Sequence, residues 1–379
     1  MKMHFRKLGL FSDIVAQAKR NQPLFPKASP GKATQQRIRE VLGFADNAAL
    51  PQDVQRIKSW EKNEVVGEMV TWSVGYGPAT EAWVLKPKGV AGGLPAVIAL
   101  HDHGGFKFFG KEKISEGFDK PPPHLIHLWE TYYGGRAYAN ALAKAGFLVL
   151  VPDAFLWGSR RFPQDLMPDW ASAAFSNLSD SPWLDEGIPA EIGEYNFAAS
   201  LHEHEVEKYC RVLGTTLAGV VAYEDRVAAN YLLTRSDVDP QRIGCVGLSG
   251  GGARSALLHA THDPIKACVI VDMMSTYADL LDSQVAAHTW LLYPGDWSRF
   301  GDWPDLAACR APSPLLVQYA LDDDLFPRDG MTAAHERLQA HYRETGHPEA
   351  YRGEFYQGPH QFDIPMQEAA FSWLEQVLN

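Results

Sequence analysis

Short apolar runs that alternate with helical patterns constrain the fold of this chain more than any other feature. The runs have the length of buried strands and lie at residues 95–101, 147–152, 242–247, 266–273 and 314–320. Apolar residues at helical spacing follow them at 136–145, 213–234, 251–260, 330–344 and 364–378. This alternation predicts an α/β fold with a mostly parallel, doubly wound sheet that carries helices on both faces.

The N-terminal part of the chain departs from this alternation. Apolar positions recur at helical spacing in 9–18 and 34–43, so we expect residues 1–60 to form a helical extension that packs on the core. Residues 65–72 and 82–85 alternate with a period of two and predict an antiparallel pair of strands. The catalytic domain is then expected to span 61–379.

A second departure is the segment 155–212, which is rich in tryptophan and proline. It interrupts the strand–helix rhythm and predicts a cap-like insertion near the active site. The carboxyl ends of parallel strands are where α/β folds bind ligands, so we place the insertion over that edge of the sheet.

Charge and composition exclude several function classes. The 379 residues carry a formal net charge of −11 and no basic run, which argues against nucleic acid or an anionic membrane as a partner. No apolar run reaches the roughly 18 residues of a membrane span. The four cysteines form no CxxC pair, and the N-terminus lacks a signal-peptide pattern. We expect a cytoplasmic protein without a cofactor, and the sequence leaves its oligomeric state open.

The segment Gly247-Leu-Ser249-Gly-Gly-Gly252 places four glycines within six residues, between an apolar run and a helical run. Its first five residues match G-x-S-x-G, in which a nucleophilic serine stands on a sharp turn between a strand and a helix. Glycines flank the serine because strand and helix pass too close for side chains. The alternative is a tight joint or a phosphate-binding loop, although G-K-[ST] is absent. We predict Ser249 as the nucleophile.

The acid and the base of such a site are expected after later strands, in that order. Asp323 lies among three adjacent aspartates that follow the run 314–320, and its offset from that strand suits the orienting acid. Asp272, at the end of the preceding strand, is the alternative acid. His360 lies in a Gly-Pro loop just before the last helix and is predicted to be the general base.

The oxyanion hole and the substrate pocket are expected around the same serine. The N–H of Gly250 is one predicted oxyanion donor, and the N–H of His103, in the loop after the first buried strand, is the other. Four aromatic residues are candidate substrate contacts, with ordinary packing as the alternative: Phe106, Trp157, Trp183 and Trp290.

The ordered set of motifs resembles a known family. The stretches PAVIALHDHGG, AYANALAKAGFLVLVPDAFLWGSRR, QRIGCVGLSGGG, PSPLLVQYALDDDLFP and GPHQF are similar to the α/β-hydrolase superfamily. Within it they resemble the dienelactone-hydrolase-like group that includes bacterial acetyl xylan esterase-like proteins. The resemblance implies the same roles for Ser249, Asp323 and His360. Asp102 and Ala320 stand where the family usually has glycine.

The sequence thus predicts a serine hydrolase that cleaves a carboxylic ester of a small or medium substrate through an acyl-enzyme. A peptidase or a carbon–carbon bond hydrolase with the same triad is the first alternative. The second is a metal-dependent hydrolase that uses His101 and His103, with His202 and His204 as a further pair. The third is a catalytically silent relative that only binds.

Overall fold

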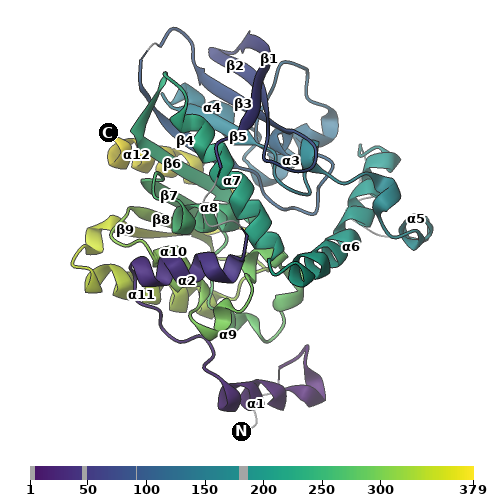
Figure 1. Ribbon diagram of the computed structural model, residues 1–379, viewed down its shortest axis with the longest axis vertical. Coiled ribbons are helices and arrows are strands. Elements are labelled where there is room, and N and C mark those ends of the chain that lie inside the picture. The colour runs from purple at the N-terminus through teal and green to yellow at the C-terminus, as the bar shows by residue number, and fades with distance from the viewer. Residues whose placement is uncertain (1–4, 45–48, 91, 179–186) are drawn as a thin grey trace.

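A central sheet organises the molecule (Figure 1). The computed structural model describes residues 5–44, 49–90, 92–178 and 187–379. Within them, a nine-stranded sheet has the order β1-β2-β3-β5-β4-β6-β7-β8-β9. The strands are β1 Gln52–Lys62, β2 Val65–Ser73, β3 Thr80–Pro87, β4 Leu94–Leu100, β5 Leu148–Pro152, β6 Val238–Leu248, β7 Ala267–Val271, β8 Leu315–Ala320 and β9 Tyr351–Tyr356.

The pairing of neighbouring strands changes once across the sheet, from antiparallel to parallel. The pairs β1–β2, β2–β3 and β3–β5 are antiparallel, and every pair from β5 through β4 to β9 is parallel. The five buried runs predicted from the sequence are strands of the parallel part, and the predicted antiparallel pair is β2–β3. The mostly parallel sheet is therefore confirmed. β9 was not predicted as a separate strand, because its alternate residues are partly exposed at the sheet edge.

Helices cover both faces of the sheet. The helices of the described residues are α1 Asp13–Asn21, α2 Lys32–Leu42, α3 Pro123–Tyr132, α4 Tyr138–Lys144, α5 Trp170–Phe175, α6 Ala190–Val212, α7 Leu217–Leu233, α8 Gly250–Thr261, α9 Tyr277–Leu280, α10 Trp303–Ala308, α11 Arg328–Glu344 and α12 Ile364–Leu378. Alternate residues of β4 point into different cores: Ile98 belongs to the core that contains residues of α2, α7, α8, α10 and α11, whereas Val97 belongs to the core that contains residues of α3, α4 and α12. The doubly wound arrangement follows from this two-sided burial. None of the helices described is long and apolar enough to cross a membrane.

The N-terminal extension is only partly helical. α1 and α2 lie where helices were expected, and Ile38 and Leu42 of α2 are buried in the core. The expectation is wrong for its last residues, because 52–60 belong to strand β1 and pair with β2. Two irregularities in the β1–β2 register, and exposure of most of the strand, mask the period of two that would have revealed it.

The described part of the insertion 155–212 contains α5 and α6. Met167, Ala171, Tyr195 and Ala199 form a small apolar cluster that joins the two helices. Figure 1 shows α5 and the N-terminal part of α6 projecting from the main body, away from the sheet. Trp183 lies outside the described residues.

Candidate active site

Ser249 occupies the turn between β6 and α8 with a backbone conformation that few residues adopt. Its φ is 57° and its ψ is −124°, a region that non-glycine residues rarely enter. The neighbouring glycines have no room for side chains. A Cβ on Gly247 would lie 2.4 Å from the Gly251 carbonyl carbon, and one on Gly251 would lie 2.1 Å from the Leu100 oxygen. The expectation that strand and helix pass too close for side chains is confirmed.

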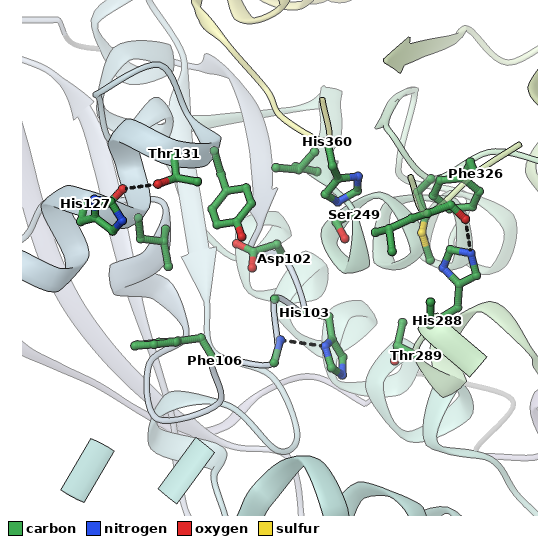
Figure 2. A pocket seen from close by; sticks show the side chains of 18 of the residues that line it. Asp102, His103, Phe106, His127, Thr131, Ser249, His288, Thr289, Phe326 and His360 are labelled. Atoms are coloured by element: carbon green, nitrogen blue, oxygen red, sulfur yellow. Dashed lines mark hydrogen bonds between the residues drawn. The ribbon is translucent and has the colours of Figure 1, made fainter. Parts of the chain in front are cut away.

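Asp323 and His360 form a direct hydrogen bond beside this turn. The His360 Nδ1 lies 2.6 Å from the Asp323 Oδ2, and the other oxygen of Asp323 accepts a bond of 2.8 Å from the Leu325 N–H. Because a carboxylate only accepts, the bonded His360 Nδ1 carries a proton, and Nε2 is left as the acceptor. Figure 2 shows the His360 ring next to Ser249.

The surroundings of His360 favour its protonated form. Burial disfavours the charged imidazole, but the hydrogen bond and the negative charge of Asp323 outweigh it, with a further contribution from Asp272. The pKa of His360 is therefore raised above its ordinary value. A base with this property holds a proton firmly once it has received one.

Asp272, the alternative acid, lies close to the pair but bonds elsewhere. Its Oδ1 accepts from the Ala320 N–H at 2.6 Å, and its Oδ2 accepts from the Gln361 N–H at 3.0 Å. Burial raises its pKa to about 7. Asp272 therefore holds the backbone at the end of β8 and in the His360 loop, whereas Asp323 contacts the imidazole.

The loop after β4 supplies the second predicted oxyanion donor. A Cβ on Gly250 would lie 2.6 Å from the His103 nitrogen, so the backbones of the two residues are in contact. Gly250 is the first residue of α8, where N–H groups have no intrahelical acceptor. Among the hydrogen bonds of the described residues, none uses the His103 N–H as donor. Both N–H groups are thus free to bind an anion beside Ser249.

A cavity of about 480 Å³ opens over Ser249 and His360. Its walls come from the loop after β4, from α3 and from the segments that follow β7, α9 and β8; they include Phe106, His124, Leu128, Thr131, Met273, His288, Thr289 and Phe326. Figure 2 labels Phe106, Thr131, His288, Thr289 and Phe326 among them. Of the predicted aromatic contacts, Phe106 lines the cavity. Trp157 is buried behind it and donates to the His103 carbonyl at 3.3 Å, and Trp290 lies outside it and donates to His204 at 2.9 Å.

One residue from a distant helix contacts the oxyanion loop and was not predicted as part of the site. Glu203, on α6, accepts a hydrogen bond of 2.7 Å from the His103 Nε2 and another from the Lys107 ammonium. Its other oxygen accepts from Thr289 at 3.2 Å. Burial opposes ionisation of Glu203, but Lys107 and His103 outweigh it, so its pKa lies well below the ordinary value. The available signal was the sequence His-Glu-His at 202–204, which was interpreted only as possible metal ligands.

The histidines of the metal alternative do not converge. His101 is buried and its Nδ1 donates to the Asp102 carbonyl at 3.0 Å, whereas the ring of His103 points to Glu203. Within the described ranges, the one group of three ligand-type side chains close enough to hold a metal is Asp272, Asp323 and His360. Its members already bond to one another or to backbone N–H groups.

Comparisons with known proteins agree with this architecture. No family model matches the chain. A curated relative named as a candidate hydrolase, YtaP of Bacillus subtilis (strain 168), is 25% identical over 303 residues, which are 80% of this chain and 85% of that protein.

Solved structures resemble the chain over nearly its whole length. A candidate acetyl xylan esterase from Bacteroides fragilis NCTC 9343 superposes with a TM-score of 0.64 at 15% identity, over 92% of this chain and 82% of that one. A glucuronoyl esterase from Solibacter usitatus gives a TM-score of 0.61 at 12% identity, over 94% and 99%. The sheet, the serine turn and these likenesses together show that the chain has the α/β-hydrolase fold.

Proposed function

We propose that this protein is a serine hydrolase that cleaves a neutral carboxylic ester through an acyl-enzyme. The observation that carries the proposal is the bond of 2.6 Å between His360 and Asp323 beside a serine whose φ is 57°. A hydrogen-bonded acid–base pair next to a strained, partly exposed serine is the arrangement that activates a hydroxyl nucleophile. The named esterases among the structural neighbours support the same chemistry.

The geometry assigns each group one task. His360 takes the proton of Ser249 through Nε2 as the hydroxyl attacks the ester carbonyl, and Asp323 holds the imidazolium in place. The N–H groups of Gly250 and His103 bind the oxygen that becomes negative in the tetrahedral intermediate. His360 then gives its proton to the leaving alkoxide, and water repeats the sequence on the acyl-enzyme, releasing the acid.

The cavity walls support a neutral substrate. The described lining residues include neither lysine nor arginine, and the one acid among them, Asp102, is paired with Lys113. Burial lowers the pKa of His124 and of His288, the latter to about 4, so both rings are uncharged near neutral pH. A carboxylate on the substrate would lose its hydration here without gaining a cation. We therefore propose esters whose acyl and alcohol parts are both uncharged.

A labelling experiment tests the assignment. A fluorophosphonate should modify Ser249 alone, and Ser249→Ala should lose both labelling and hydrolysis of p-nitrophenyl acetate while keeping its circular dichroism spectrum. Loss of the nucleophile lowers turnover by about a million-fold in comparable enzymes. Ser255→Ala is the matched control, because Ser255 lies further along α8 and is buried away from the cavity. Retention of more than about a tenth of the turnover in Ser249→Ala would contradict the proposal.

A substrate panel tests the neutral class. Acetylated sugars and p-nitrophenyl esters of increasing acyl length should be cleaved. The methyl ester of a sugar acid should also be cleaved, because its carboxyl group is esterified and the molecule is neutral. The half-ester of a dicarboxylic acid should be a poor substrate, because it keeps one ionised carboxylate. Faster cleavage of the ionised half-ester than of its dimethyl ester would show that a cation reaches the substrate, contrary to this proposal.

A further inference from the structure

A buried cluster of charged groups lies behind the oxyanion loop and has no part in the proton transfers. Lys113 is fully buried, and its ammonium lies 2.5 Å from the Asp102 Oδ2. The other oxygen of Asp102 accepts a bond of 2.5 Å from the Tyr133 hydroxyl. Burying a charged pair is costly unless both members are well bonded. A cluster of this kind at the edge of the cavity therefore requires an explanation.

The ammonium also bonds to the backbone of the oxyanion loop. The Lys113 Nζ donates to the Asp102 carbonyl at 2.8 Å and to the His103 carbonyl at 3.0 Å. The His101 Nδ1 donates to the same Asp102 carbonyl at 3.0 Å. Two donors, one of them charged, thus converge on one peptide oxygen.

That oxygen belongs to the peptide group whose N–H is the predicted oxyanion donor. In a trans peptide the carbonyl of one residue and the N–H of the next lie in one plane and point in opposite directions. Anchoring the Asp102 carbonyl on Lys113 therefore turns the His103 N–H away from Lys113. The His103 nitrogen lies next to Gly250, since a Cβ on Gly250 would lie 2.6 Å from it.

The charge has a second effect on the same group. An ammonium bonded to a carbonyl draws electron density toward the oxygen, so the N–H of that peptide becomes a stronger donor. The effect is strongest where water is excluded, as it is around Lys113. The Asp102 carboxylate neutralises the buried charge of Lys113, while the Asp102 carbonyl oxygen still accepts the hydrogen bond from the same ammonium.

We propose that Lys113 is a positioning residue that orients and polarises the Asp102–His103 peptide as an oxyanion donor, with the Asp102 carboxylate as its counterion. This inference rests on the proposed function of Ser249. It also gives a role to the aspartate that stands where the resembling family usually has glycine.

A matched pair of lysines makes the proposal testable. Lys111 and Lys113 lie on the same short turn, η2 Lys111–Lys113, and both are buried. The Lys111 ammonium pairs with Asp153, Glu81 and Glu112, and among the bonds and ion pairs of the described residues it has none to the oxyanion loop. Lys111→Met thus removes a buried ammonium of the same turn without altering the peptide of His103.

The experiment compares turnover with the binding of a boronic acid, which forms a tetrahedral adduct on the serine and places an oxygen in the oxyanion hole. In Lys113→Met we expect kcat for p-nitrophenyl acetate to fall by about 100-fold, the range for loss of one oxyanion donor. The inhibition constant of butylboronic acid should rise by a similar factor, with little change in KM. In Lys111→Met, the ratio of this inhibition constant to KM should stay at the wild-type value.

Since Lys113→Met leaves Asp102 without its counterion, the double variant Asp102→Asn/Lys113→Met is measured beside it and should show the same losses. Wild-type boronate affinity in a folded Lys113 variant would overturn the inference, and so would equal losses in the Lys111 and Lys113 variants. If wild type and Ser249→Ala hydrolyse esters equally, the proposed function itself fails. That outcome is separate, because it does not depend on either lysine.

Discussion

Replacing Asp323 by asparagine should nearly abolish turnover, because the structure dictates how the new amide must lie. In the native chain, one oxygen of Asp323 accepts from the Leu325 N–H at 2.8 Å and the other faces His360 at 2.6 Å. An asparagine must present its oxygen to the Leu325 N–H, so its NH₂ group faces the His360 Nδ1. The imidazole then carries its proton on Nε2 and cannot accept one from Ser249.

The magnitude follows from this forced tautomer. The comparable change in a serine protease lowers kcat by about ten-thousand-fold, which corresponds to about 5.4 kcal/mol of transition-state stabilisation at 1.36 kcal/mol per factor of ten. The side chain of Asp323 is only 1% exposed, so water has little room to replace the lost acceptor. We expect a loss of this order in Asp323→Asn without loss of the fold.

Three variants serve as controls in the same assay, turnover of p-nitrophenyl acetate with circular dichroism as the check on folding. Asp324→Asn should be nearly silent, because Asp324 is exposed. Asp322→Asn should have a small effect, through its bond of 3.0 Å to the Gly358 N–H. In Asp272→Asn, an NH₂ group must face a backbone N–H, so stability should fall by about 1–3 kcal/mol while most turnover remains. A severe loss in Asp272→Asn together with a mild one in Asp323→Asn would refute this reasoning.

Three further predictions concern titration and packing. Because only neutral His360 accepts a proton and its pKa is raised, kcat/KM should fall as the pH drops through a midpoint above 6.5. A pH–rate profile should also show this midpoint at a lower pH in Asp323→Asn. Burial raises the pKa of Asp272 from 3.8 to about 7, so the protonated side chain contributes its full stability below pH 3.8 and this contribution is lost as the pH rises through about 7. Calorimetry should therefore show that the wild type loses stability relative to Asp272→Asn over this pH interval. In Gly250→Ala, a Cβ 2.6 Å from the His103 nitrogen must push the oxyanion loop away, so kcat should fall by about 100-fold with KM little changed, as steady-state kinetics would show.

Sequence patterns predicted the parts of this protein that depend on local order along the chain. A strand, a glycine-flanked serine and a helix are consecutive, so the turn at Ser249 could be placed from its neighbours alone. The position of Asp323 after β8 and its bond to His360 follow from where the strands of a parallel sheet end. Their catalytic roles remain predictions until the variants are measured.

Contacts between segments that are distant in the sequence could not be predicted from local patterns. Glu203 meets His103 across 100 residues of sequence, and no local pattern shows which carboxylate will reach which histidine. The same limit applies to Trp157 and Trp290: a tryptophan-rich segment indicates apolar surface, but only the packing decides that one ring lies behind the oxyanion loop and the other outside the cavity. Lys113 gave no signal because charged residues usually remain in water.

The first strand of the sheet has a consequence for the solubility of the whole protein. β1 is an edge strand of eleven residues, and most of it is exposed, so its free backbone groups could pair with a strand from another molecule. Val54 and Ile57 are 45% and 53% exposed there and would favour such pairing. Arg56 and Lys58 interrupt the apolar residues, and a break in the β1–β2 register falls between these two cations. Charge and irregular geometry at one short stretch thus act as a barrier to edge-to-edge aggregation.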